Sequence, residues 1–295
     1  MNKFIGTGVA LITPFDENHQ VDYIGLKKIV KFQINNGIDY LVILGTTGEA
    51  ATLNKDERNK VIQTIIDVNN GILPLVLGIG GNNTNLVIET IKKTDLNKID
   101  AILSVSPFYN KPTQEGIYQH FKAIASSTNK DIILYNVPHR TGKNVDPETI
   151  IRLANDCNNI VAVKDAASDI QQTFEIIKNK PNNFLVISGD DSLALSATLA
   201  GGDGVISVIG QGMPNEFSKM IKLGLEGNNK DAYEIHYKLM DLINLIFQEG
   251  NPAGIKGILK HKGICNTMLR LPLVEISDNL YQEIISELLL ISRNN

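Results

Sequence analysis

The sequence predicts an α/β fold: a (β/α)8 TIM barrel followed by a C-terminal helical domain. Eight short runs of apolar and β-branched residues recur through the first two thirds of the 295 residues, and helical patterns lie between them. Strands that alternate with helices indicate βαβ units and a parallel sheet, and eight such units suit a closed barrel better than an open sheet. After about residue 225, only helical patterns follow.

The eight runs are apolar throughout, as is typical of strands that are buried on both faces of a parallel sheet. They are Gly8–Pro14, Tyr40–Leu44, Leu73–Ile79, Ala101–Val105, Asp131–Val137, Ile160–Lys164, Phe184–Ser188 and Gly204–Ile209. The active site of such a barrel lies at the carboxyl ends of its strands, so the residues that end these runs are the first candidates for chemistry.

Helical patterns separate the runs. Five helices are expected, at Tyr23–Asn36, Lys55–Asn69, Gln114–Ser127, Pro147–Asn155 and Asp191–Ala200. The second follows Asn54, an N-cap residue type, with Glu57 three residues on, which is the pattern of a capping box. The fourth begins with Pro147 directly after Asp146, and proline is favoured at the first position of a helix.

The end of the chain is expected to form a separate helical domain, because a barrel of this kind typically needs ~250 residues or fewer. Three helices are expected there, at Asp231–Gln248, Pro252–His261 and Asp278–Ser292. The turn-forming residues Gly227-Asn228-Asn229 divide the chain into a catalytic barrel, residues 1–226, and a helical domain, residues 227–295.

Composition and charge favour a cytoplasmic enzyme that acts on a small molecule. The net charge of −4 gives no reason to expect a nucleic-acid partner, and no apolar run approaches the ~18 residues of a membrane span. The first apolar stretch soon meets Pro14, Asp16 and Glu17, so it indicates a strand rather than a signal peptide. Cys157 and Cys265 lie far apart and the five histidines lack ligand spacing, so we expect buried thiols and no metal site.

Lys164 is the most informative residue, because it ends the apolar run that begins at Ile160. A lysine there is costly unless it is paired or functional. Burial of a lysine favours its free amine, and a free amine is what attacks the carbonyl of a keto acid to form a Schiff base. On strand position alone, an ion pair with Asp165 or another acid is the better interpretation. The other residues at the ends of the runs favour the catalytic one.

Four of those residues complete a candidate site. Tyr135 could carry the proton transfers of imine formation, although a strand tyrosine is as often a core residue. Thr46 and Thr47 lie between glycines in a turn that could bind a carboxylate, or they could simply cap a helix. Arg140 lies in a loop after a proline, where it could clamp a carboxylate or remain solvated.

Two further motifs are weaker. Gly78-Ile79-Gly80-Gly81 lacks the rest of a nucleotide-binding motif, so a nucleotide is not expected. Asp190 and Asp191 follow the seventh run and could bind a cation, but the pattern better predicts a cap of the next helix.

Together, these motifs resemble the dihydrodipicolinate synthase family, whose members are also called 4-hydroxy-tetrahydrodipicolinate synthases. The resemblance covers nearly the whole chain. Its motifs are GVALITPF, GTTGEAATL, SPFYNKPTQEG, YNVPHRTG, VAVKDA, SGDD, GVISV, NPAGIK and LRLPL. It implies a barrel with a C-terminal helical domain, a homotetramer built as a dimer of dimers, and no cofactor. It also implies condensation of pyruvate with L-aspartate 4-semialdehyde, on the route to diaminopimelate and lysine.

The resemblance assigns roles to individual residues. It implies that Lys164 forms the Schiff base and that Tyr135 donates and accepts protons. Thr46 and Tyr109 would complete a proton relay, with Tyr109 entering from the neighbouring subunit. The residues that it implies for substrate binding are Thr47 and the backbone of Ile206 for pyruvate, and Arg140 for the carboxylate of the semialdehyde.

Two alternatives to the synthase remain. N-acetylneuraminate lyase, or another pyruvate-dependent sugar-acid aldolase, would use Lys164 and Tyr135 equally well. Arg140 suits a short substrate that ends in a carboxylate, and the paired threonines resemble the synthases more than the lyases. His139 stands where the family usually has a small residue. A non-catalytic metabolite sensor is disfavoured, because no residue of the implied machinery is missing.

Weak inhibition by lysine, or none, is also expected. In lysine-sensitive relatives the effector binds away from the barrel mouth, and the resemblance implies which positions of this chain match that site. They are Ala50, Lys55, Arg58, Asn82, Leu86 and Phe108. Only Asn82 is retained, and Leu86 removes the carboxylate that would pair with the ammonium group of lysine.

Overall fold

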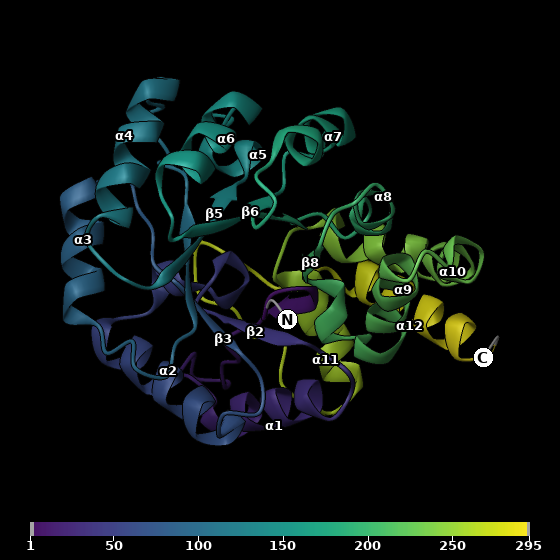
Figure 1. Ribbon diagram of the computed structural model, residues 1–295. Helices are drawn as coiled ribbons and strands as arrows, with labels where there is room; N and C mark the ends of the chain where they lie inside the picture. The colour runs from purple at the N-terminus through teal and green to yellow at the C-terminus, as the bar shows by residue number, and fades with distance from the viewer. Residues whose placement is uncertain (1–2, 294–295) are drawn as a thin grey trace.

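The structure, a computed structural model, describes residues 3–293 and contains a closed barrel of eight parallel strands in sequential order. The predicted fold class is therefore confirmed. The strands are β1 (Gly6–Ala10), β2 (Tyr40–Ile43), β3 (Leu75–Gly78), β4 (Ala101–Val105), β5 (Asp131–Asn136), β6 (Ile160–Asp165), β7 (Leu185–Ser188) and β8 (Gly204–Ser207). Figure 1 shows the barrel encircled by its helices.

The outer helices follow the strands in turn. They are α1 (Tyr23–Ile34), α2 (Lys55–Asn69), α3 (Thr84–Lys93), α4 (Gln114–Ala125), α6 (Pro147–Asp156), α7 (Ile170–Asn179), α8 (Ala194–Leu199) and α9 (Pro214–Leu225). The predicted capping box before α2 is present, with Asn54 and Glu57 exchanging hydrogen bonds. The sequence patterns missed α3, α7 and α9, and α8 is shorter than expected.

Single-turn helices occupy the loops at the strand ends. They are η1 (Thr46–Gly48), η2 (Ala50–Thr52), α5 (Pro138–Thr141) and η3 (Ile209–Gln211). The first strand ends at Ala10, earlier than its apolar run suggests. Beyond it, the backbone N–H of Ile12 donates to the side chain of Gln211 rather than to a strand. The apolar run continues only because this loop is also buried.

The core has two parts, because each strand is buried on both faces. One apolar cluster fills the barrel interior and includes Tyr40, Val76, Ile133, Ile187 and Ile206. The larger cluster packs the opposite faces of the strands against the helices. Each fully buried aliphatic side chain contributes ~1.5–3 kcal/mol, so this second layer supplies most of the hydrophobic stabilisation.

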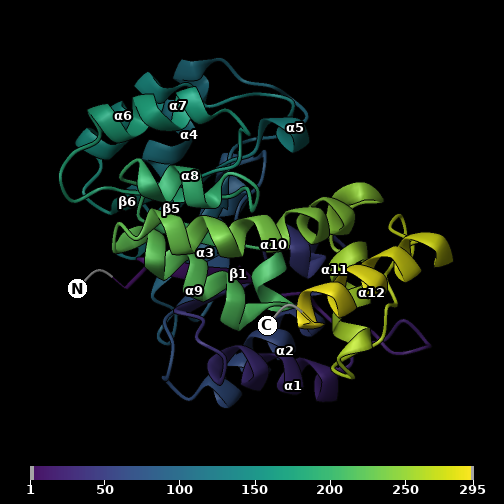
Figure 2. The same cartoon turned by 90° about the vertical axis from the view of Figure 1, so that its right-hand side faces the viewer.

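The last three helices lie together on one side of the barrel (Figure 2). They are α10 (Asn229–Gln248), α11 (Ala253–His261) and α12 (Asp278–Arg293). The helix α10 packs on α8 and α9, while α11 and α12 pack on α10 and on each other. The division at residues 226 and 227 stays a prediction. Residues 294–295, which it assigns to the helical domain, lie outside the described residues.

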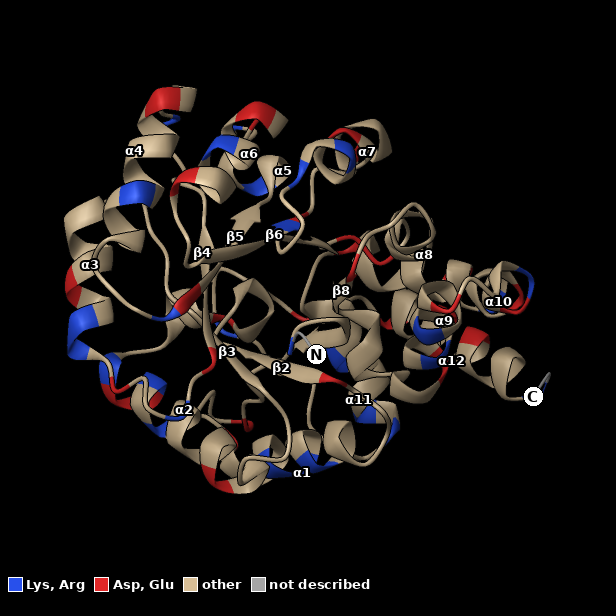
Figure 3. Ribbon diagram, in the orientation of Figure 1, with Lys and Arg blue, Asp and Glu red and all other residues tan. Residues whose placement is uncertain are grey.

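Charges of both signs alternate over the outer helices (Figure 3), in keeping with the small net charge. No helix within residues 3–293 is long and apolar enough to cross a membrane. Cys157 and Cys265 are both free; Cys157 is buried as expected, whereas Cys265 is only partly buried.

Barrel closure predicts a large cost for a side chain at Gly204. This residue pairs with Gly6 at the seam of β1 and β8, has φ +134°, and would place a Cβ 2.0 Å from the Gly6 carbonyl oxygen. Gly204→Ala should therefore lower the free energy of unfolding by at least ~3 kcal/mol. Gly227→Ala is the matched control, because Gly227 has φ +76° with nothing near its Cβ position. It should cost only ~1–2 kcal/mol in denaturant unfolding. Equal losses in the two variants would contradict the assigned role of the seam.

Candidate active site

A cavity of roughly 410 Å³ opens at the carboxyl ends of the strands and is closed on one side by α10. Five of the predicted site residues line it: Thr46, Thr47, Tyr135, Arg140 and Lys164. They come from the ends of β2, β5 and β6, so they meet only in the folded barrel.

Lys164 and Tyr135 lie side by side because β5 and β6 pair in a register that sets them opposite each other. The Lys164 Nζ atom lies 4.2 Å from the centroid of the Tyr135 ring. Both side chains are almost fully buried, at 6% and 7% exposed. Within residues 3–293, no carboxylate forms an ion pair with Lys164. An amine that faces a cavity without a counter-charge is suited to act as a nucleophile.

Asp165 would be the ion-pair partner of Lys164 if this lysine had only a structural role, but its carboxylate binds other groups. Its carboxylate accepts hydrogen bonds from Asn136, Gln172 and Thr173. Burial raises the pKa of Asp165, and these hydrogen bonds oppose the increase. The structure therefore removes the main alternative to a functional Lys164.

Gly189 provides the space that the Lys164 side chain occupies. An added Cβ at Gly189 would lie 2.9 Å from Lys164 Cε and 2.7 Å from the Cβ of Ala166. The Cβ of Ala166 is fixed to the backbone directly after β6 and cannot rotate out of the way. Any larger residue at position 189 would therefore displace the Lys164 amine. The sequence motif SGDD contains this glycine, but its spacing alone gave no sign of the contact.

The Thr46–Thr47 turn is held from several directions. Its residues form the single turn η1 after β2, where Thr46 is exposed and Thr47 is buried. The Nδ2 atom of Asn251 donates to Thr47 Oγ1 over 2.9 Å, and Thr13 Oγ1 donates to the Gly48 carbonyl over 2.7 Å. Asn251 also lines the cavity, and the sequence gave no indication of this contact.

Arg140 lies in α5 with its side chain exposed to the cavity. It forms no ion pair within the described part of the chain, so its guanidinium group is available for an anion. Its neighbour His139 also lines the cavity and forms a hydrogen bond with the backbone of Ala166. Burial and the charge of Arg140 lower the pKa of His139, which favours a neutral imidazole near neutral pH.

The comparisons with known proteins identify the family of the chain. The model of the dihydrodipicolinate synthetase family matches residues 3–289. The chain belongs to this family. A 4-hydroxy-tetrahydrodipicolinate synthase from Flavobacterium psychrophilum is 56% identical over 280 residues, which cover 95% of this chain and 96% of that protein.

Solved structures of the family have the same fold. The dihydrodipicolinate synthase of Aquifex aeolicus superimposes with a TM-score of 0.94 at 39% identity, covering 98% of each chain. The enzyme of Cyanidioschyzon merolae, solved with lysine bound, superimposes with a TM-score of 0.95 at 35% identity, covering 99% of each chain. The predicted family is thereby confirmed.

Two residues that the family resemblance implied do not line this cavity. Tyr109 follows β4, is 89% exposed, and adopts a left-handed backbone with φ +73°. A non-glycine residue in that conformation is strained, and such strain often marks a functional position. Ile206 is buried in the barrel interior beside the site and is not among the residues that line the cavity.

A second cavity of roughly 650 Å³ adjoins the first and shares Thr46, Tyr135, Arg140 and Asn251 with it. It also contains five of the six positions matched to the lysine site of relatives, and Lys55 is the exception. Those five are Ala50, Arg58, Asn82, Leu86 and Phe108.

The two aspartates after β7 have different hydrogen-bond partners. Asp190 accepts hydrogen bonds from the backbone of Ser192 and Leu193, in the turn before α8. Asp191 instead accepts from the backbone N–H groups of Val208 and Ile209, so it ties the end of β7 to the loop after β8. The expectation that Asp190 and Asp191 cap the next helix is wrong, because no side chain caps α8 and the fully buried Asp191 carboxylate binds the neighbouring loop.

The pKa of Asp191 predicts a pH-dependent contribution to stability. Burial raises this pKa to about 6 in the folded protein, against an ordinary value of 3.8. The raised pKa of Asp191 therefore adds most to the free energy of unfolding below pH ~4, and this contribution is lost as the pH rises through about 6. Between pH 5 and 7.5, wild-type protein should lose on the order of 1 kcal/mol of stability relative to Asp191→Asn. Urea unfolding at both pH values measures this difference, and a constant difference would contradict the raised pKa.

Proposed function

We propose that this chain is a 4-hydroxy-tetrahydrodipicolinate synthase that condenses pyruvate with L-aspartate 4-semialdehyde. One observation carries the proposal: the Lys164 amine faces a cavity beside the Tyr135 ring, and no carboxylate of residues 3–293 pairs with it. Relatives that share about half of the sequence over nearly their whole length carry this enzyme name. The sugar-acid aldolase alternative has no such support among them.

The reaction begins at Lys164. Its free amine attacks the ketone carbon of pyruvate, and the resulting carbinolamine loses water to give a protonated imine. Loss of a proton from the methyl group gives an enamine, since the imine accepts the electron pair. The enamine carbon then attacks the aldehyde carbon of the second substrate. The amine of that substrate displaces Lys164 Nζ, which closes the ring and frees the enzyme.

We assign the proton transfers of these steps to Tyr135, because its ring centroid lies 4.2 Å from the Lys164 Nζ atom. We assign Thr46 and Tyr109 to the relay that connects the Tyr135 hydroxyl group to solvent. Since Tyr109 is exposed and lies outside the cavity of its own chain, this role requires a neighbouring subunit. A homotetramer built from dimers meets that requirement. The homotetramer and the cytoplasmic location stay predictions.

Substrate binding is divided between two sides of the cavity. Thr47 and the backbone of Ile206 would hold the pyruvate carboxylate near Lys164. Arg140 would hold the carboxylate of the semialdehyde, because its guanidinium group is exposed and unpaired within the described residues. No metal or organic cofactor enters the scheme, since the protonated imine accepts the electrons.

A coupled assay tests the proposed function directly. The purified protein should consume pyruvate only when L-aspartate 4-semialdehyde is present, and it should release no pyruvate from N-acetylneuraminate. The Lys164→Ala variant is the control and should be inactive. Cleavage of N-acetylneuraminate at a rate comparable to the condensation would favour the sugar-acid aldolase instead.

Arg140→Ala should selectively weaken the binding of the second substrate, the semialdehyde. Loss of a charged hydrogen bond costs ~1.5–3 kcal/mol, so KM for the semialdehyde should rise by about tenfold or more. KM for pyruvate should stay nearly unchanged. Arg152→Ala is the control, because Arg152 pairs with Glu115 on the outside of the barrel. Equal changes for both substrates would argue against this assignment.

Lysine should inhibit weakly or not at all. Of the described residues lining the second cavity, the only carboxylate is that of Glu49, and it already pairs with Lys256. Glu89 pairs with Lys93 outside the cavity, and Asn83 uses its Oδ1 atom to cap α3. Arg58 and Arg140 add positive charge. A lysine ammonium group would therefore enter without a counter-charge, which is costly.

Titration of L-lysine at saturating pyruvate measures the effect. We expect little inhibition in the millimolar range, and Leu86→Glu should increase it, because it restores a carboxylate. Strong inhibition of the wild-type enzyme at sub-millimolar lysine would show that residues other than the six matched positions bind the effector.

A further inference from the structure

A buried ion pair joins the active-site turn to the C-terminal helices. Glu49 directly follows Thr46-Thr47-Gly48, and its Oε1 atom lies 2.5 Å from the Nζ atom of Lys256 on α11. Both side chains are completely buried. The two residues are 207 positions apart in the sequence.

Each charged group has further partners that fix its position. The Oε2 atom of Glu49 accepts from the backbone N–H of Arg270. The Lys256 ammonium group also donates to the Met268 carbonyl over 2.8 Å and lies 4.6 Å from the centroid of the Phe15 ring. Burial lowers the pKa of Lys256, while the charge of Glu49 opposes this change and holds the ammonium form.

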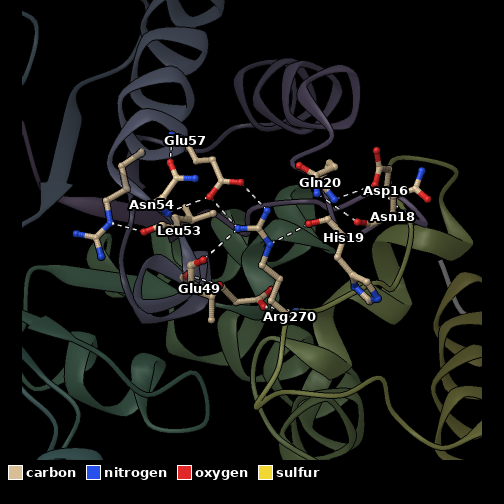
Figure 4. A network of polar contacts seen from close by, with 11 residues as sticks. Asp16, Asn18, His19, Gln20, Glu49, Leu53, Asn54, Glu57 and Arg270 are labelled. Carbon is tan, nitrogen blue, oxygen red and sulfur yellow. Dashed lines mark hydrogen bonds and ion pairs between the residues drawn. The ribbon is translucent and has the colours of Figure 1, made fainter.

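The same C-terminal segment holds both flanks of the turn. Before α11, Asn251 donates to Thr47. After it, Arg270 donates to the Thr52 carbonyl and to both carboxylate oxygens of Glu57. Figure 4 shows the Arg270 side chain lying between the Glu57 and His19 segments. The turn that presents Thr46 and Thr47 to the cavity is therefore fastened mainly by residues that come last in the chain.

The backbone of the turn requires such fastening. Glu49 adopts a left-handed conformation with φ +49°, and so does Leu44 with φ +55° just before the turn. Each such non-glycine residue is strained and persists only where its surroundings hold it. Released from Lys256, the turn could relax, and Thr46 and Thr47 would move relative to Lys164 and Tyr135, which lie on separate strands.

We propose that the Glu49–Lys256 ion pair positions the Thr46–Thr47 turn for catalysis, so that α11 contributes to the geometry of the active site. Lys256 and Glu49 are positioning residues, because neither lines the cavity that contains Lys164. The inference rests on the proposed Schiff-base function. It predicts that loss of the pair slows the steps that need the threonines, whereas Lys164 still forms its adduct when pyruvate is saturating and the incubation is long.

Four variants separate positioning from folding. Lys256→Met leaves the Glu49 carboxylate buried without a counter-charge, which destabilises the fold. The double variant Glu49→Gln/Lys256→Met removes both charges at similar volume, and neutral replacements of buried ion pairs often retain stability. Glu49→Gln alone is the milder single change, because the glutamine side chain can still accept a hydrogen bond from Lys256 and the Met268 carbonyl still accepts another. Lys180→Met is the matched control, since Lys180 pairs with Asp203 at 2.9 Å near the start of β8, away from the cavity.

Three quantities are measured for each variant: Tm, kcat at saturating substrates, and the yield of pyruvate adduct trapped by borohydride. The double variant should return Tm close to the wild-type value, yet its kcat should stay at least about tenfold low, because small displacements of catalytic groups are costly. After a long incubation at saturating pyruvate, its adduct yield should remain within about twofold of wild type, because Lys164 and Tyr135 are untouched. Lys180→Met should lose stability but keep its kcat.

Recovery of kcat together with Tm in the double variant would overturn the proposal, because the pair would then be structural only. If Lys256→Met does not fold, Glu49→Gln is judged by the same comparison of kcat with adduct yield. Wild-type protein that traps no pyruvate would refute the proposed function itself, which is a result separate from any difference among the variants.

Discussion

The closure of eight parallel strands into one barrel is the constraint on which the site depends. Closure directs the carboxyl ends of all strands to a single rim, so Lys164, Tyr135 and the Thr46–Thr47 turn meet there although 118 positions separate the first from the last of them. Within that frame, the register of β5 and β6 sets Tyr135 opposite Lys164. A shift of one residue would turn one of the two side chains away.

Two buried lysines show how the surroundings decide the use of the same side chain. Lys256 has no exposed surface and is neutralised by Glu49, so its amine is held in place by a carboxylate and a carbonyl. Lys164 is almost as buried, but it has no ion pair within the described residues and lies against the face of an aromatic ring. The first arrangement stabilises a loop, and the second leaves the amine facing a cavity large enough for a small substrate.

The sequence predicted the parts of the molecule that depend on local pattern. Continuous apolar runs identified the strands, and a lysine that ends such a run identified Lys164. The outer helix α7 was missed, since its single buried stripe is short. Lys256 shows the same signal as Lys164, a lysine within the apolar segment GIKGIL, but the pattern cannot reveal a partner 207 positions away. Asp191 was misassigned for a similar reason, because its hydrogen bonds cross to the loop after β8.

The most direct test of the account is the site of the covalent adduct. Wild-type protein is incubated with pyruvate, reduced with borohydride, digested and analysed by mass spectrometry. The account predicts one modified peptide, with the added mass on Lys164 and none on Lys256. Modification of Lys256, of another lysine, or of no lysine at all would contradict it.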